Sequence, residues 1–532
     1  MRLCLAVVLS CILCARLRAL QPHGRLFPSP SPSKTGGGLL KGMRHRYGVS
    51  GPLDASASAS VASSVVDVGV PTGGIQLHEV VDVPDSGRAA PSFDWMAHWY
   101  PIAPVSCTDK ERPFSFTLLN QPLVIWWDEP KQEWRCALDR CPHRMAPLSE
   151  GRIVEGNVEC PYHGWRFEGS TGGCTAIPQA QPDTPLPIGT RACATIFPCQ
   201  EQQGLVWVRP TPDTQQQHGG GAEAGWPAML TSETVDSEQP NAVTFDSFRD
   251  VPYDYATLFE NLIDQSHVPI THHGSASSRK KAKHLPLRMT RPASERGFEG
   301  VYEDSEERVE TVFRAPMYQH HNATRKGYSL TALHYCVPME PGRARIIGRI
   351  TVKFDNGGPV VGLLRRVPLW LVHLFALRSL DDDNIFLHVQ DRRIAAAGGP
   401  GKLPQNYYLP TATDLYVAQF RTWVKKWGSN GPWGFEPLEG LTKLTPRSEL
   451  LNHVDSHIIH CTQCLKALKT MNSLKGYLRV GVLLGIIGAS RLAGKMAWYS
   501  GGGMVACAMA MAAISAIENA LKYGPEIPMR NK

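Results

Sequence analysis

"CPHRMAPLSEGRIVEGNVECPYHGW", residues 141–165, contains two short Cys–His pairs. The first is Cys141-x-His143, and the second, after sixteen intervening residues, is Cys160-x2-His163. Two Cys and two His can hold a structural zinc ion or a two-iron cluster. We favour the cluster, because a single residue separates the first pair and Pro follows each Cys. Two similar loops, each supplying one Cys and one His, also suit two irons.

These loops resemble the Rieske signature of ring-hydroxylating oxygenases. The resemblance implies that Cys141 and Cys160 bind one iron of a [2Fe-2S] Rieske cluster, and that His143 and His163 bind the outer iron. Neutral imidazole ligands raise the potential of such a cluster, so that it accepts electrons from a low-potential donor.

A second motif, "ENLIDQSHVPITHHG", covers residues 260–274. Its polar positions follow the pattern Asn261-x2-Asp264-x2-His267-x4-His272. We expect a helix on which Asp264 and His267 share a face and which Pro269 ends. Two histidines and one distant carboxylate make the facial triad of mononuclear iron(II) oxygenases, which leaves open positions for O2. The motif therefore predicts a mononuclear Fe(II) site held by His267 and His272.

The acidic segment "LDDDNIFLHVQDRR", residues 380–393, is the best source of the third ligand. In the oxygenases that the chain resembles, the ligand carboxylate lies seven residues before a glutamine. Gln390 then indicates Asp383, while Asp381 and Asp382 stay as alternatives. The aspartate triplet can also simply cap the following helix.

The same resemblance implies a role for Asp264. It would link a Rieske histidine to a histidine of the mononuclear site, across two subunits of a head-to-tail homotrimer. A carboxylate in this position orients both imidazoles and couples the two metal sites. We count Asp264 and Asn261 as the catalytic residues outside the ligand sets.

Cys461-x2-Cys464 lies shortly before an apolar tail. We interpret it as a redox-active pair, since the absence of a second Cys pair nearby disfavours zinc. This combination resembles the plastid oxygenases related to pheophorbide a oxygenase, which include Tic55-like and protochlorophyllide-associated proteins. The resemblance implies that the chain oxygenates a chlorophyll-derived tetrapyrrole with O2 and ferredoxin-derived electrons. The alternative is a membrane redox component, linked to plastid protein import, that senses thiol state through the CxxC motif.

Both ends of the chain carry targeting or membrane signals. Residues 1–85 begin with a short apolar segment and continue without an acidic residue until Asp54, which is typical of a signal followed by a transit peptide. Residues 476–517 include 22 consecutive uncharged residues, so we expect one or two transmembrane helices there. A plastid membrane, either envelope or thylakoid, is the expected location.

Between these ends we expect an α+β protein. An all-β Rieske domain covers residues 92–212, a linker 213–239, a helix-grip mononuclear iron domain of α+β type 240–450, and the CxxC segment 451–470. The chain lacks a dinucleotide fingerprint and plant-type ferredoxin cysteine spacing, so electrons must come from ferredoxin or a similar external donor. A net charge of +7 over 532 residues, without long basic runs, disfavours nucleic acid as a partner.

Overall fold

The computed structural model describes residues 93–181, 185–187, 189–212, 239–434, 441–528 and 531. The targeting segment expected over residues 1–85, and nearly all of the linker expected over 213–239, lie outside these ranges.

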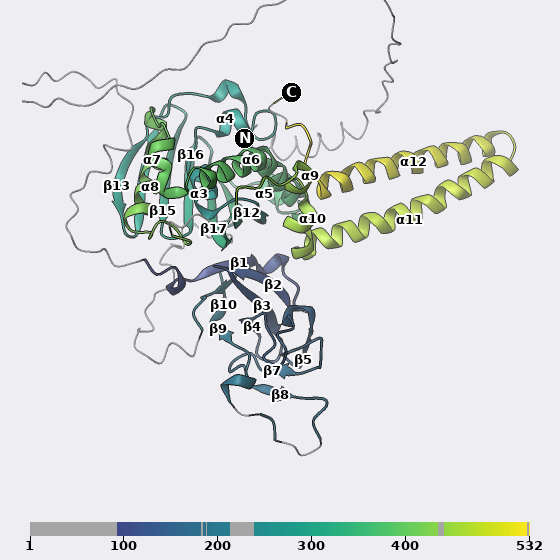
Figure 1. Ribbon diagram of the computed structural model, residues 1–532. Helices are drawn as coiled ribbons and strands as arrows, with labels where there is room; N and C mark the ends of the chain where they lie inside the picture. Colours follow the sequence, from purple (N-terminus) through teal and green to yellow (C-terminus); the bar gives the residue numbers. More distant parts are fainter. Residues whose placement is uncertain are drawn as a thin grey trace, which may run out of the picture. The chain divides into compact units, whose positions relative to one another are not determined.

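The N-terminal part, residues 93–212, is built of antiparallel strands (Figure 1). In spatial order, its three sheets are β1 (Tyr100–Pro104), β11 (Leu205–Val208) and β10 (Cys199–Gln202); β2 (Phe114–Leu118), β3 (Gln121–Asp128), β4 (Glu133–Leu138) and β9 (Ile196–Phe197); and β5 (Arg152–Val154), β6 (Asn157–Glu159), β7 (Arg166–Phe167) and β8 (Cys174–Ala176). The run LVIWW in β3 is buried on both faces, as its unbroken apolar sequence predicts. Leu119 and Asn120 both have positive φ, which closes β2 and β3 with a tight hairpin turn.

The second part is centred on a seven-stranded antiparallel sheet with the order β12-β18-β17-β16-β15-β14-β13. The strands are β12 (Ala242–Val251), β13 (Arg288–Ser294), β14 (Gly297–Glu303), β15 (Glu307–Arg314), β16 (Tyr318–Arg325), β17 (Tyr328–Glu340) and β18 (Arg343–Phe354). Successive hairpins join β13 to β18, and β12 pairs with the last strand.

Three helices pack against this sheet: α3 (Tyr255–Ile263), α6 (Leu369–Ala396) and α8 (Leu415–Lys426) (Figure 1). Aromatic rings fill the space between them, and Phe259 of α3 stacks on Phe420 of α8 with centroids 4.6 Å apart. Burying such large apolar surfaces is the main force that holds the helices to the sheet. The α+β class and the all-β character of the N-terminal part are confirmed.

Short helical segments connect these elements. They are α4 (Val268–Thr271), α5 (Pro359–Leu364), α7 (Leu403–Asn406), α9 (Arg447–Leu450), α10 (His453–Ser456), and the 3-10 turns η1 (Trp95–Ala97), η2 (Val105–Cys107), η3 (Leu148–Glu150), η4 (Thr190–Ala192), η6 (Arg279–Lys281), η7 (Pro400–Lys402), η8 (Ala412–Asp414) and η9 (Ile458–His460).

One local expectation is wrong. Helix α3 ends at Ile263, and Asp264 has an extended backbone, so Asp264 and His267 do not share a helical face. Pro269 does not end a helix but lies in the first turn of α4. That position is favourable for proline, because the N–H groups of a first helical turn have no partner within the helix.

Buried polar contacts join the two parts. The Arg345 guanidinium on β18 pairs with Asp250 on β12 and also donates to the backbone carbonyl of Ile102 on β1 (3.0 Å). The turn after β2 adds two bonds, from the N–H groups of Leu119 and Asn120 to the carbonyls of Pro338 and Met339. One hydrophobic core includes residues of both parts.

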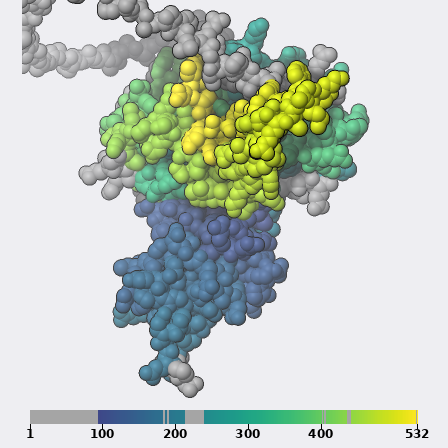
Figure 2. Space-filling view, turned by 90° about the vertical axis from the view of Figure 1, so that its right-hand side faces the viewer, coloured from purple at the N-terminus to yellow at the C-terminus, as the bar shows by residue number. Residues whose placement is uncertain are grey.

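The chain continues into two long antiparallel helices, α11 (Thr462–Arg491) and α12 (Lys495–Lys522) (Figure 1). A side chain added at Gly481, Gly485 or Gly488 of α11 would strike Cys507, Met504 or Ser500 of α12, so the glycines allow close packing. The outer apolar side chains of both helices lie exposed at the surface (Figure 2). By length and composition alone, α12 is the one described helix able to cross a membrane.

Candidate metal centres

Two similar loops carry the first four predicted ligands. The Cys141 loop follows β4, and the Cys160 loop joins β6 to β7. In each loop the cysteine N–H bonds a carbonyl five residues later, at Ala146 and Trp165, both at 2.8 Å. The repeated hydrogen-bond pattern explains why both loops begin with Cys-Pro and end in a residue with a free choice of backbone angle, Met145 and Gly164, each at positive φ.

The cysteines and the histidines of these loops lie in different surroundings. Cys141 and Cys160 are buried, whereas His143 and His163 are only partly covered, with ring centroids 4.7 Å apart. Trp165 stacks on His143, with centroids 4.6 Å and planes 11° apart. An inner pair of sulfurs and an outer pair of imidazoles are what a cluster with one thiolate-bound and one imidazole-bound iron requires.

The chemistry of these donors fits the cluster. Burial raises the pKa of the Cys141 thiol to about 11, so the thiolate is formed only when a metal binds. Nδ1 of His143 is buried and lacks a hydrogen-bond partner among the described residues. A bound iron would satisfy this nitrogen.

The second site lies between α6 and the segment after α3. His267 and His272 flank the four residues of α4, and Asp383 faces them from the middle of α6. The donor atoms of these three residues all lie within 4.8 Å of one another. The Asp383 carboxylate lies 3.9 Å from Nε2 of His267 and 3.4 Å from Nε2 of His272.

This arrangement fits a divalent cation. Burial raises the pKa of Asp383, against the opposing effects of His272 and His267. Its Oδ1 atom is buried without a hydrogen-bond partner in the part of the chain that the structure describes. A cation bound by both histidines and this oxygen would stabilise the carboxylate and satisfy the orphaned atom.

The three consecutive aspartates have different partners. Asp381 pairs with Arg249 at 2.8 Å and with His453 at 3.0 Å. Asp382 accepts a hydrogen bond from Ser275 and lies 3.5 Å from Nδ1 of His272, on the side of the ring away from Asp383. Only Asp383 of the three joins both histidines, so the geometry supports it as the third ligand.

Asn261 and Asp264 lie beside His267. Nδ2 of Asn261 is 3.5 Å from Nε2 of His267, and the backbone carbonyl of Asp264 accepts a hydrogen bond from Nδ1 of His267 at 2.6 Å. This bond leaves Nε2 free to bind metal and sets the orientation of the ring. The Asp264 side chain is about one quarter exposed and accepts hydrogen bonds from the backbone and hydroxyl of Ser266.

Cys461 and Cys464 are fully buried and are both free thiols. Hydrogen bonds accepted from Cys107 and Cys464 lower the pKa of Cys461, and the same contact raises that of Cys464. The structure also places His373 and His457 against the pair. His457 stands four residues before Cys461, a spacing visible in the sequence, whereas His373 is 84 residues from His457 and has no local signal.

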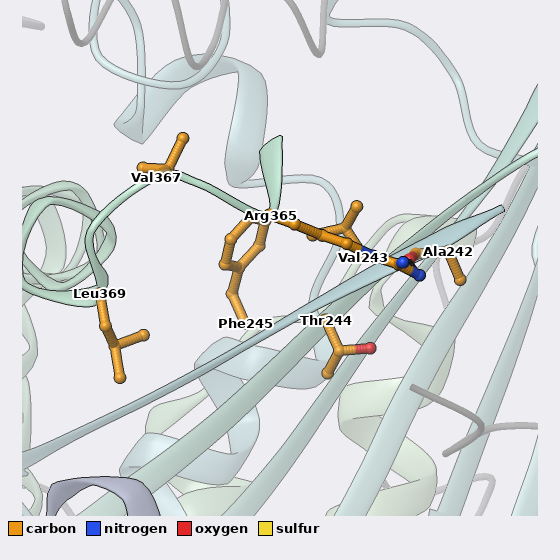
Figure 3. A pocket seen from close by; sticks show the side chains of 7 residues that line it. All are labelled: Ala242, Val243, Thr244, Phe245, Arg365, Val367 and Leu369. Carbon is orange, nitrogen blue, oxygen red and sulfur yellow. Dashed lines mark hydrogen bonds between the residues drawn. The ribbon is translucent and has the colours of Figure 1, made fainter. Parts of the chain in front are cut away.

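A pocket of about 260 Å3 lies along β12 and the start of α6 (Figure 3). Its lining residues are Ala242, Val243, Thr244, Phe245, Arg365, Val367 and Leu369. None of the predicted metal ligands lines it, and Arg365 already donates to the carbonyls of Gln239 and Ala242. We therefore assign it no part in the chemistry of the iron sites.

Comparisons with known proteins agree with these features. Residues 98–197 match the model of the Rieske [2Fe-2S] domain, and residues 313–400 match that of pheophorbide a oxygenase. The second match includes Asp383.

Three relatives illustrate the range of similar proteins. The chain is 34% identical to pheophorbide a oxygenase of Oryza sativa subsp. japonica, covering 74% of this chain and 77% of that protein. It is 32% identical to the protochlorophyllide-dependent translocon component 52 of Arabidopsis thaliana, covering 73% and 76%. It is 30% identical to flavonoid 8-hydroxylase 2 of Ocimum basilicum, covering 78% and 81%.

All three relatives are chloroplastic, which agrees with the expected plastid location. Identity at this level extends over both metal centres and the C-terminal segment that follows them. The chain therefore belongs to the pheophorbide a oxygenase family of Rieske non-haem iron oxygenases, as its motifs predict.

Proposed function

We propose that this chain oxygenates a chlorophyll-derived tetrapyrrole, with His267, His272 and Asp383 as the ligands of the catalytic iron. The observation that carries the proposal is the buried triad, whose donor atoms lie within 4.8 Å of one another, in a chain 34% identical to a pheophorbide a oxygenase. In this family the Rieske cluster supplies electrons and the mononuclear iron activates O2.

The chain's own residues prepare both sites. Cys141, His143, Cys160 and His163 hold the cluster. Asp264 fixes the ring of His267 through its backbone carbonyl, and Asp382 lies against the outer nitrogen of His272. Because Asp383 is 3% exposed, water has little access to its carboxylate.

We also propose the head-to-tail homotrimer and a bridging role for Asp264. Met145 and Tyr162, on the two cluster loops, are strongly exposed, so apolar surface surrounds the outer histidines. Exposed apolar surface of this kind favours contact with another chain. The partly exposed carboxylate of Asp264 is an acceptor that a Rieske histidine of the partner subunit can reach.

The test is turnover of the full chain loaded with iron and cluster. Pheophorbide a, ferredoxin with its reductant, and 18O2 should yield a ring-opened product that carries the isotope. A panel should include chlorophyllide a, protochlorophyllide and a flavonoid, because the relatives' names span these substrates. Labelling of the flavonoid alone would overturn the tetrapyrrole assignment.

Asp383→Ala should abolish turnover and the binding of the mononuclear iron, while the absorption and EPR spectra of the Rieske cluster persist. The matched control is Asp355→Ala, an exposed aspartate in the turn after β18, which should behave as the unmodified chain. Full turnover by Asp383→Ala would show that another carboxylate binds the iron.

The second candidate is a redox component of a translocon, supported by the name of the Arabidopsis relative. Such a carrier needs only the cluster, whereas an oxygenase needs roughly three irons per chain. Iron analysis of the reconstituted protein separates them, because the carrier would hold roughly two. We further propose that ferredoxin is the donor and that α12 anchors the chain in a plastid membrane, with fractionation of envelope and thylakoid deciding which.

A further inference from the structure

Four buried side chains outside both iron sites converge on one point. His373 comes from the first turns of α6, His457 lies between α10 and η9, Cys461 caps α11, and Cys464 lies in its first turn. Their donor atoms all lie within 4.8 Å of one another, and all four residues are buried.

The distances between donor atoms match the edges of a tetrahedron around a metal. Nδ1 of His373 lies 3.2 Å from Nε2 of His457, and each of these nitrogens lies 3.3 Å from Sγ of Cys464. Sγ of Cys461 is 3.5 Å from Nδ1 of His373. Tetrahedral zinc places two nitrogen ligands about 3.3 Å apart and a nitrogen and a sulfur about 3.6 Å apart.

The outer nitrogens of both rings are already used. Nε2 of His373 bonds the carbonyl of Asp246 at 3.1 Å, and Nδ1 of His457 bonds the carbonyl of Phe248 at 2.7 Å. Carbonyls only accept, so these nitrogens carry the protons and each neutral ring turns a lone pair inward. Lone pairs facing each other at 3.2 Å repel unless a cation lies between them. A protein carbonyl bound to the outer N–H is the usual support of a metal-binding histidine.

We propose that His373, His457, Cys461 and Cys464 form a structural Zn2+ site. Four protein ligands close the coordination sphere, and no position remains open for a substrate, which distinguishes a structural from a catalytic zinc. The site ties α6, which also carries Asp383, to the start of the helical hairpin. The proposal does not depend on the substrate of the oxygenase.

Elemental analysis of the full chain, purified reduced and loaded with iron, tests the site. We expect about one zinc per chain in addition to the irons, and zinc X-ray absorption should give two sulfurs at about 2.3 Å and two nitrogens at about 2.0–2.1 Å. Full iron without zinc, or a zinc shell without sulfur, would overturn the proposal.

A paired set of variants sharpens the test. Cys464→Ser should lower zinc from about one to near zero per chain and leave the Rieske spectrum intact, since the cluster loops have a separate core. Cys336→Ser is the control, because Cys336 is an equally buried free thiol on β17, away from the four ligands. Equal zinc in both variants would contradict the ligand set.

The unmodified chain provides a readout that does not depend on a variant folding. Alkylation followed by mass spectrometry should find Cys461 and Cys464 protected in the zinc-loaded protein and modified after a zinc chelator is added. A Cys461–Cys464 disulfide in the purified protein, or protection that the chelator does not change, would instead support a metal-free pair.

Discussion

Asp381, Asp382 and Asp383 are consecutive on α6, so their side chains leave the helix about 100° apart. That rotation brings Asp381 to Arg249 and His453, Asp382 to Ser275, and Asp383 to the two iron-site histidines. The sequence alone leaves the three interchangeable, because identical residues differ only in what surrounds them. The choice of ligand is therefore a property of the helix orientation.

Asp381→Ala should destabilise the fold by about 3–5 kcal/mol, because it leaves the buried guanidinium of Arg249 without its ion-pair partner. Denaturant unfolding of the full chain measures this change. In the exposed pair of Asp109 and Arg112, Asp109→Ala should cost at most about 1 kcal/mol. Equal losses in the two variants would show that the buried pair has no special weight.

Asp391 gives a pH-dependent prediction. Burial and the nearby charge of Asp254 raise the pKa of Asp391 to about 6 from 3.8. A raised carboxyl pKa means that folding favours the protonated form, so stability from this group is present below about pH 4 and is lost as pH rises through 6. Asp391→Asn should therefore raise the free energy of unfolding at pH 7 by on the order of 1 kcal/mol. The gain should vanish near pH 4, and a constant gain would contradict the titration.

At the scale of elements, the motifs and the strands are the most predictable features. Buried runs such as LVIWW in β3 and the two Cys–His loops need only local sequence. The end of α3 was harder to predict, because the extended backbone of Asp264 depends on hydrogen bonds made with Ser266. His373 could not be connected to the CxxC motif, because α6 and α11 meet only in the folded chain.

The helical hairpin depends on its glycines. Gly485→Leu should separate α11 from α12, since a Cβ atom there would lie 2.8 Å from the Cβ atom of Met504. Hydrogen exchange of α12 in detergent micelles should rise by at least about tenfold, as expected for a loss of at least about 1.4 kcal/mol. Gly476→Leu, where the added atom meets nothing within 4 Å, is the control. Equal exchange in both variants would show that close approach is not what holds the pair.

At the scale of the whole molecule, the proposed trimer predicts complementation between defective subunits. Cys141→Ser removes a ligand of the cluster, and Asp383→Ala removes a ligand of the catalytic iron, so each variant alone should be inactive. Co-expressed chains with separable tags should recover part of the activity, because an intact cluster of one subunit can serve the intact iron of its partner. Mixing only after purification, without exchange of subunits, is the control.

Absence of activity in isolated mixed trimers that contain both intact sites would mean that electrons stay within one chain. Asp264→Asn in the Asp383→Ala subunit should not matter, whereas in the Cys141→Ser subunit it should lower the recovered rate, because only that subunit's Asp264 adjoins a working iron. A rate that falls equally in both combinations would contradict the bridging role.

The separation of two hydrophobic cores has a consequence for biogenesis. Cys141 and Cys160 belong to a small core with Val158 and Phe167, while the large core joins the remaining strands to the catalytic sheet and helices. β3 divides its side chains between the two cores. The chain can therefore reach its final shape almost everywhere before the iron–sulfur cluster is delivered to it. Cofactor delivery, and not completion of the fold, would then set how quickly newly made protein matures, and a shortage of clusters would leave a reserve of folded chains waiting for them.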